Sequence, residues 1–230
     1  DNKTSDGNGT GAFTSQLTNL THSTTYYIRA YATNSEGTSY GEQKYFSTLS
    51  DGMINGHQYV DLGLSSGLKW ATCNIGADSP EDYGNYYAWG ETETKAEYTE
   101  DNSVTFGQQL NDISGNAQYD AAAANWGGSW RMPTRDEIRE LIYNCSWTPE
   151  TQNGVDGFKV TGNNGNYIFI PASGYRDGSS SYIYGECYYW SSTPHQYSND
   201  YSYILYSDYE YQSEDMNYRY RGLTIRPVSN

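Results

Sequence analysis

Tyrosines crowd one stretch near the carboxyl end of the chain, residues 198–222, which reads SNDYSYILYSDYEYQSEDMNYRYRG. Twelve of the 26 tyrosines fall between Tyr182 and Tyr220, whereas the last lysine is Lys159. Rigid phenol rings give contact area at a low entropy cost, while serine, asparagine and aspartate adapt their hydrogen bonds, as in antibody paratopes. Lysine is depleted from such surfaces because ordering its long stem is costly. Residues 194–221 are therefore predicted to form a binding face.

The competing interpretation is an ordinary half-buried sheet, in which tyrosines such as Tyr201 and Tyr203 are cross-strand partners. Core strands would use Val, Ile, Leu and Phe, because burying a phenol whose hydroxyl lacks a partner costs about 1–3 kcal/mol. Ile204, Leu205 and Met216 are nearly the only aliphatic candidates for the inside of this segment. The predicted contact residues, of which Trp190 is expected to be partly structural, are Tyr189, Trp190, His195, Tyr197, Tyr201, Tyr203, Tyr206, Asp208, Tyr209, Tyr211, Tyr218 and Tyr220.

Metal chemistry is weakly supported by the sequence. His22, His57 and His195 lie in different regions and form no HxxxH or HExxH spacing, which argues against zinc. Calcium is a lesser candidate, because no EF-hand spacing is present. The carboxylates that could supply its oxygen ligands are Asp177, Asp200, Asp208, Glu210, Glu214 and Asp215. The alternative is that these acidic residues lie in solvated loops and bind no metal.

Three cysteines, Cys73, Cys145 and Cys187, stand far apart without a CxxC pair, which excludes a zinc ribbon or a thioredoxin-like site. They are either three small buried residues, or one disulfide and one free thiol. The sequence also contains no P-loop or GxGxxG motif. We therefore expect a protein that is not an enzyme.

Composition and charge restrict the class of protein further. The chain has 230 residues, a net charge of −15 and 16% aromatic residues, so it should fold into one large or two modest domains. The acidic charge argues against nucleic acid, because phosphate binding needs clustered Lys and Arg. No apolar run of 18 residues is present. The polar start, DNKTSDGNGTG, leads us to expect that the natural N-terminus lies upstream.

Strand patterns dominate the first 50 residues, and two helices are predicted farther along. Residues 13–20, 24–34 and 42–48 are expected to be strands, and 24–34 alternates as a strand with one buried face. Residues 57–63 and 68–76 are expected to form a hairpin. Strands are also predicted within 155–177 and at 222–229.

The two predicted helices differ in how well the sequence specifies them. The first is centred on the alanine-rich residues 117–127 and ends at Gly127. The second spans about 134–144, because Thr134 and Glu137 form a capping box and Ile138 and Leu141 share one face. We expect Arg131 and Arg226 to be structural ion-pair partners. Strands, two helices and many short strands together predict an α+β fold with domains at 1–50 and 51–230.

The segment TTYYIRAYATN (24–34) resembles the penultimate strand of a fibronectin type III domain. The resemblance covers about half of such a domain. It implies that residues 1–50 are a partial fibronectin-like β-sandwich module, whose open edges make independent stability doubtful.

Six landmarks in order resemble the Fibrobacter-type major paralogous domain of Bacteroidetes surface proteins: VDLGLSSGLKWATCNIGA, EDYGNYYAWGE, GGSWRMPTRDEIRELI, NGNYIFIPASGYRDG, YYWSST and RGLTIRPVS. That family in turn resembles the C-type lectin fold of formylglycine-generating enzymes and of the variable proteins of diversity-generating retroelements. The resemblance implies a C-type-lectin-like domain over 51–230, in which the segment between Trp190–Thr193 and Arg226–Val228 faces the ligand.

The resemblance also guides the expected function. Formylglycine-generating enzymes depend on two neighbouring cysteines near the C-terminus, and here only Cys187 is present, so the reaction is not expected. Sugar-binding C-type lectins use EPN, QPD or WND triplets, which are missing. We expect a secreted or surface-anchored, adhesin-like protein that binds a protein or peptide, with retroelement diversification as a further hypothesis. The alternatives are a carbohydrate-binding module, the formylglycine-type enzyme and an adhesive pilus-tip component.

Overall fold

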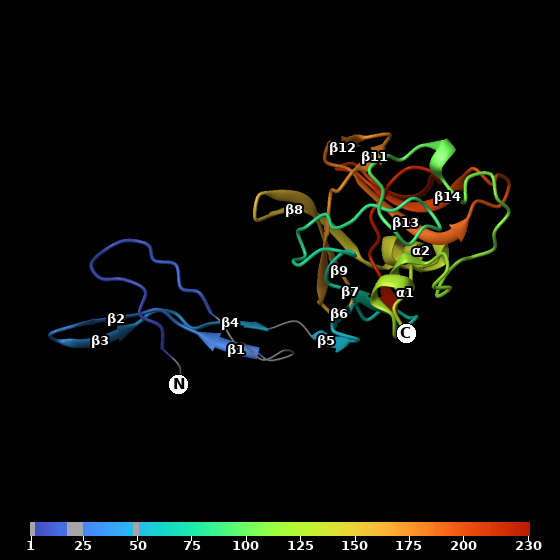
Figure 1. Ribbon diagram of the computed structural model, residues 1–230. Coiled ribbons are helices and arrows are strands. Elements are labelled where there is room, and N and C mark those ends of the chain that lie inside the picture. The colour runs from blue at the N-terminus through green and yellow to red at the C-terminus, as the bar shows by residue number, and fades with distance from the viewer. Residues whose placement is uncertain (1–2, 18–24, 48–50) are drawn as a thin grey trace. The chain divides into compact units, whose positions relative to one another are not determined.

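The computed structural model describes residues 3–17, 25–47 and 51–230, and the chain divides into two compact units, Asp1–Ser50 and Asp51–Asn230 (Figure 1). The predicted strand at 13–20 is not found over residues 13–17, and residues 18–20 lie outside the described part. His22 also lies outside it.

The first unit contains two antiparallel strand pairs. β1 (Thr25–Ile28) pairs with β4 (Lys44–Ser47), and β2 (Tyr31–Asn34) pairs with β3 (Gly37–Tyr40). The predicted single strand over 24–34 is thus two strands. Its expected buried face is absent over residues 25–34, because Ile28 and Ala32 are both exposed.

A four-stranded sheet in the second unit joins the start and the end of the domain. Its order is β16 (Val228–Ser229), β7 (Lys69–Ala71), β6 (His57–Asp61) and β5 (Asp51–Ile54), and all neighbours are antiparallel. The predicted hairpin of residues 57–63 and 68–76 is confirmed by the pairing of β6 with β7.

The helices begin where their capping residues predict. In α2 (Arg135–Asn144), the Thr134 hydroxyl accepts from the Glu137 amide at 3.3 Å, and the Glu137 carboxylate accepts from the Thr134 amide at 2.8 Å. α1 (Ala121–Trp126) is shorter than predicted, because Asp120 caps its first turn and Gly127, with φ of 62°, follows its end. A single 3-10 turn, η1 (Glu100–Asn102), precedes both.

Three further antiparallel sheets follow α2. One has the order β10 (Tyr167–Pro171), β9 (Val155–Thr161) and β8 (Ser146–Gln152). β11 (Tyr175–Asp177) pairs with β12 (Ser180–Tyr182). The third has the order β13 (Cys187–Pro194), β14 (Tyr201–Ser207) and β15 (Gln212–Tyr218), and α2 packs against it (Figure 1).

The predicted α+β, C-type-lectin-like class is wrong for this structure. The second unit is mostly β, built from several small antiparallel sheets, and its two α-helices contain only 6 and 10 residues. The alanine-rich stretch suggested more helix than forms, because Asp120 takes an extended, capping conformation instead of a helical one. Residues 146–218, in turn, are divided among eight strands.

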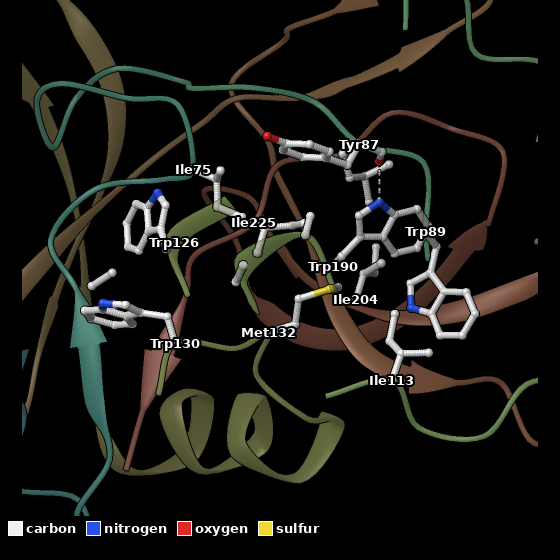
Figure 2. Close-up of a cluster of buried hydrophobic side chains, with 14 residues drawn as sticks. Ile75, Tyr87, Trp89, Ile113, Trp126, Trp130, Met132, Trp190, Ile204 and Ile225 are labelled. Atoms are coloured by element: carbon white, nitrogen blue, oxygen red, sulfur yellow. Dashed lines mark hydrogen bonds between the residues drawn. The ribbon is translucent and has the colours of Figure 1, made fainter. Parts of the chain in front are cut away.

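The core of the second unit is centred on tryptophans contributed by separate segments (Figure 2). Trp190 is fully buried, and its indole N–H donates to the Tyr87 carbonyl at 2.8 Å. Trp89 donates in the same way to Ser191 at 2.9 Å, and Trp130 to Ile54 at 2.8 Å. These three buried indole N–H groups are therefore satisfied by backbone carbonyls, which ties the loops to the sheets.

The two arginines predicted to form structural ion pairs behave differently. Arg131 pairs with Glu137 at 2.7 Å, as expected. Among the residues that the structure describes, Arg226 has no carboxylate partner: its guanidinium donates to Asn74 Oδ1 at 2.8 Å and to the carbonyls of Ala71 and Thr72. Burial lowers the pKa of Arg226. The prediction for Arg226 was wrong because backbone carbonyls, which the sequence does not mark, serve as its acceptors.

Candidate functional site

The sheet β13–β14–β15 carries most of the tyrosine-rich segment, and both of its faces are covered over β13 and β14. Trp190 and Ile204 are paired across strands and lie in the tryptophan core, whereas Tyr189 and Leu205 alternate with them on the opposite face and are buried too. Tyr189 donates its hydroxyl to the Pro171 carbonyl at 2.7 Å. Tyrosines can therefore be accessible only where these strands extend beyond the core.

Six tyrosine rings form a continuous series of contacts at one edge of this core. Neighbouring ring centroids are 5.0–6.3 Å apart, within the range of favourable aromatic pairs. We call this series the tyrosine ladder; in order of contact it consists of Tyr184, Tyr182, Tyr175, Tyr188, Tyr206 and Tyr211.

Strand pairing places the rungs of the ladder. Tyr175 stands opposite Tyr182 in the β11–β12 pair, and Tyr188 stands opposite Tyr206 in the β13–β14 pair. The two pairs meet because the Tyr175 and Tyr188 rings contact each other edge to face at 5.1 Å. The inner rungs are half-buried, while the end rung Tyr184 is 75% exposed. The ladder thus has a fixed base and accessible ends.

A second group of rings continues from the other end of β14 and β15. Tyr201 and Tyr218 are cross-strand partners whose centroids are 4.3 Å apart. His195 contacts the Tyr201 ring at 6.3 Å. We call the whole set the second ring group; it consists of Phe106, His195, Tyr197, Tyr201, Tyr203, Tyr218 and Tyr220.

Arg221 joins the ladder to the second ring group. Its guanidinium lies 4.8 Å from the Tyr175 ring and 5.3 Å from the Tyr218 ring. Its Nε donates to Asp177 Oδ2 at 2.9 Å, and Nη1 donates to Asn217 Oδ1 at 3.1 Å. A planar cation that stacks on two rings and pairs with a carboxylate fixes both ring sets against each other.

A buried arginine supports the second ring group from below. Arg219 donates to the Tyr201 carbonyl and the Ser202 hydroxyl, both at 3.0 Å, and to the Gln108 carbonyl at 2.7 Å. It lies over the Trp89 ring at 4.2 Å. Burial lowers the pKa of Arg219 to about 10. Loop 105–108 and strand β14 are thus held together by one cation beneath the surface.

Carboxylates surround the ladder and act on its phenols. The Tyr206 hydroxyl donates to Asp208 Oδ2 at 2.9 Å. Burial and the nearby charge of Glu186 raise the pKa of Tyr188 to about 12. Burial, together with Asp208, raises the pKa of Tyr206. Backbone N–H donors lower the pKa of Asp208, so this carboxylate is ionised beside neutral phenols.

Eight of the twelve predicted contact residues belong to these ring sets: Tyr206 and Tyr211 to the ladder, and His195, Tyr197, Tyr201, Tyr203, Tyr218 and Tyr220 to the second ring group. Asp208 adjoins them through Tyr206.

The remaining predicted contact residues lie apart or inside. Tyr209 is exposed but contacts Phe158. Tyr189 and Trp190 are core residues that an outside ligand cannot reach. Tyr203, although it belongs to the second ring group, is also buried, beneath Arg135. Met216, expected inside, is 46% exposed.

Sequence reasoning missed part of the site. Tyr182, Tyr184 and Tyr188 belong to the same tyrosine-rich run and could have been included on composition. Tyr175 and Phe106 lie far from that run, so no local pattern marks them. Arg221 was missed because a single arginine among tyrosines gives no indication of what it contacts.

The metal and thiol candidates do not converge. Within the described ranges, no three His, Cys, Asp or Glu side chains gather closely enough to hold a metal ion. Two calcium candidates are instead ion-paired: Asp177 with Arg221, and Glu214 with Arg135. His57 stacks on Trp126 at 3.8 Å.

The three cysteines are free thiols. Cys187 is buried, and this burial raises its pKa. Burial also raises the pKa of Cys145 to about 11. Both thiols are thus held in their neutral, unreactive form at neutral pH.

The fold and the site define a β-rich domain that presents an aromatic surface. The chain belongs to the Lcl C-terminal domain family, whose model matches residues 62–229. This membership suggests a variable, ligand-binding surface protein. No curated protein and no solved structure matches the chain. None of the helices in the described ranges is long and apolar enough to cross a membrane.

Proposed function

We propose that this chain is a non-catalytic, adhesin-like surface protein that recognises a protein or peptide through the tyrosine ladder and the second ring group. The observation that carries the proposal is the continuity of the rings, which Arg221 extends across both sets. Exposed rings of this kind give a ligand a large, preorganised contact area, because two side-chain torsions suffice to order a tyrosine.

The architecture of the rings supports recognition rather than folding alone. Tyr197 is 84% exposed, and Tyr184 and Tyr211 are also exposed, so a bound ligand can bury these rings. Their neighbours Tyr188, Tyr201 and Tyr218 are half-buried and hold the surface in place. Binding hot spots commonly combine an anchored aromatic centre with a polar rim.

The proposal extends to location and domain organisation. The six sequence landmarks, which resemble Fibrobacter-type major paralogous domains, support display on a cell surface or secretion. The resemblance of residues 24–34 to a fibronectin type III strand supports a role for the first unit as a spacer module. Retroelement diversification of residues 194–221 would fit a face whose accessible side chains include tyrosine, asparagine and aspartate.

A display experiment tests the proposal. Peptides selected from a random phage-displayed library on the wild-type protein are re-tested on a variant carrying Tyr184→Ala, Tyr197→Ala and Tyr211→Ala. Because each substitution removes an exposed ring, we expect at least a tenfold loss of affinity with the melting temperature unchanged. The matched control is Tyr143→Ala, an exposed tyrosine of α2 that belongs to neither ring set.

Two results would contradict the proposal. If the selected peptides bind the triple variant and the wild type equally well, the rings are not the recognition surface. If the triple variant loses affinity and its melting temperature also falls markedly below that of the wild type, the rings serve folding. A glycan array that gives ring-dependent binding, while peptides do not bind, would replace the peptide by a carbohydrate as the ligand.

A further inference from the structure

Arginines within this domain repeatedly stack on a tyrosine ring beside a carboxylate. Arg221 lies over Tyr175 at 4.8 Å and pairs with Asp177. Arg135 lies over Tyr203 at 3.9 Å, and its Nε donates to Glu214 at 3.0 Å. In both places the ring face attracts the cation and the carboxylate accepts its N–H groups.

The far end of the ladder has the ring and the carboxylate without the arginine. The Tyr206 and Tyr211 rings are 5.7 Å apart, and Asp208 accepts the Tyr206 hydroxyl at 2.9 Å. Asp208 Oδ1 accepts from the amides of Glu210 and Tyr211 at 2.8 and 3.0 Å. Oδ2 accepts one bond only, so it has capacity for another donor. Among the ion pairs of the described residues, none includes Asp208.

The charge around this end of the ladder favours a cation. Glu186 and Asp208 both act on the Tyr206 phenol, and Asp215 acts on Tyr188. Like Asp208, neither Glu186 nor Asp215 has an ion-pair partner among the described residues. The only lysine or arginine between positions 182 and 220 is Arg219, which is buried. Tyrosine faces and uncompensated carboxylates attract cations by the same electrostatics.

We propose, building on the recognition surface of the preceding section, that Tyr206, Tyr211 and Asp208 form a subsite for an arginine side chain from a basic segment of a partner protein. Arginine fits better than lysine because its planar guanidinium stacks on a ring while its N–H groups reach a carboxylate, as Arg221 and Arg135 do here. A peptide fits better than a free amine, because the ladder continues over six rings and Glu186 and Asp215 offer further sites for cations.

Fluorescence anisotropy with three labelled peptides tests this subsite. The probes are GSRGSRGS, the same peptide with citrulline in place of arginine, and the same peptide with lysine. We expect the arginine peptide to bind at least tenfold more tightly than its neutral citrulline isostere and severalfold more tightly than the lysine peptide. Its affinity should fall as the sodium chloride concentration rises, because charge pairing is screened by salt.

Isosteric variants locate the binding. Asp208→Asn keeps an oxygen for the Glu210 and Tyr211 amides but removes the charge, so we expect about a tenfold loss for the arginine peptide. Tyr211→Ala should cost a similar factor. Circular dichroism would show whether Asp208→Asn disturbs folding. In that case Glu186→Gln gives a second test, because Glu186 lies outside the turn formed by residues 208–211. The control is Asp78→Asn, at an exposed carboxylate that lies outside both ring sets.

The outcomes separate this inference from the function on which it rests. If the citrulline and arginine peptides bind equally well, the surface binds peptides but the arginine subsite is wrong. The same conclusion follows if Asp208→Asn and Glu186→Gln leave the affinity unchanged while Tyr184→Ala and Tyr197→Ala reduce it. If no ring substitution affects any peptide, both proposals fail. If arginine amide alone competes as well as the peptide, the subsite takes a small cation and the protein partner is wrong.

Discussion

Replacing Arg221 by methionine tests whether one guanidinium holds the two ring sets together. Methionine keeps an unbranched apolar stem but removes the ion pair with Asp177 and both ring contacts. The Arg221 and Asp177 side chains are 25% and 32% exposed, so solvent screens their pair and its contribution is about 0.5–1 kcal/mol. Each cation–π contact, with Tyr175 and with Tyr218, contributes about 0.5–1 kcal/mol.

The free energy of unfolding should therefore fall by roughly 1.5–3 kcal/mol in Arg221→Met. At roughly 2–4 °C per kcal/mol for a chain of this size, the melting temperature should fall by about 3–12 °C. Urea unfolding followed by tryptophan fluorescence at pH 7 measures the first quantity, and calorimetry measures the second.

Arg139→Met is the matched control for this experiment. Arg139 Nε lies 3.5 Å from Glu214 on a half-exposed side chain and contacts no ring, so its loss should change the free energy of unfolding by less than about 0.5 kcal/mol. If Arg221→Met is as mild as Arg139→Met, the junction does not stabilise the rings. If a Tyr175→Leu substitution in the Arg221→Met background costs as much as it does in the wild type, the two groups are not coupled.

Two further predictions concern buried titratable groups. Asp120→Asn should lower the free energy of unfolding by about 2–4 kcal/mol in urea denaturation. The Asp120 carboxylate accepts from four backbone N–H groups, and an amide cannot accept from all of them, so buried donors such as the Met132 N–H would be left unpaired. An unchanged urea midpoint would refute this. The raised pKa of Tyr188, about 12 against 10.0 unfolded, means that the native state keeps a proton that the unfolded state loses, so stability should fall as the pH rises from 10 towards 12. Tyr188→Phe should flatten that part of the stability profile, and a profile identical to that of the wild type would contradict the assignment.

Local elements were predictable because the physics that forms them is local. The Thr134 and Glu137 capping box fixes the start of α2, and it requires only two residues three positions apart. The pairing of β6 with β7 follows from two short apolar runs joined by a turn. The tyrosine-rich composition likewise identified a segment that carries the exposed rings Tyr197, Tyr209 and Tyr211, since composition is itself a local property.

The fold class and the membership of the site depend on contacts that the sequence does not encode locally. Tyr175 reaches the ladder only because β11 pairs with β12 and its ring then contacts Tyr188 on β13. Phe106 joins through a loop that Arg219 fastens from below. Tyr189 and Trp190 were predicted to be contact residues, with Trp190 partly structural, whereas here both faces of β13 are covered and both residues are buried.

The tyrosines themselves resolve the choice between a binding face and a half-buried sheet by dividing into two kinds. Tyr86, Tyr98 and Tyr189 donate their hydroxyls to backbone carbonyls at 2.5–2.7 Å, so burial costs them no hydrogen bond and they belong to the fold. Tyr184 and Tyr197 have contacts through their ring edges and faces and are mostly exposed. A residue that is half apolar and half polar can do either, and in these three tyrosines a carbonyl within reach of the hydroxyl accompanies burial of the ring. Composition fixes how many phenols are present, but only the tertiary structure determines which of them remain for a ligand.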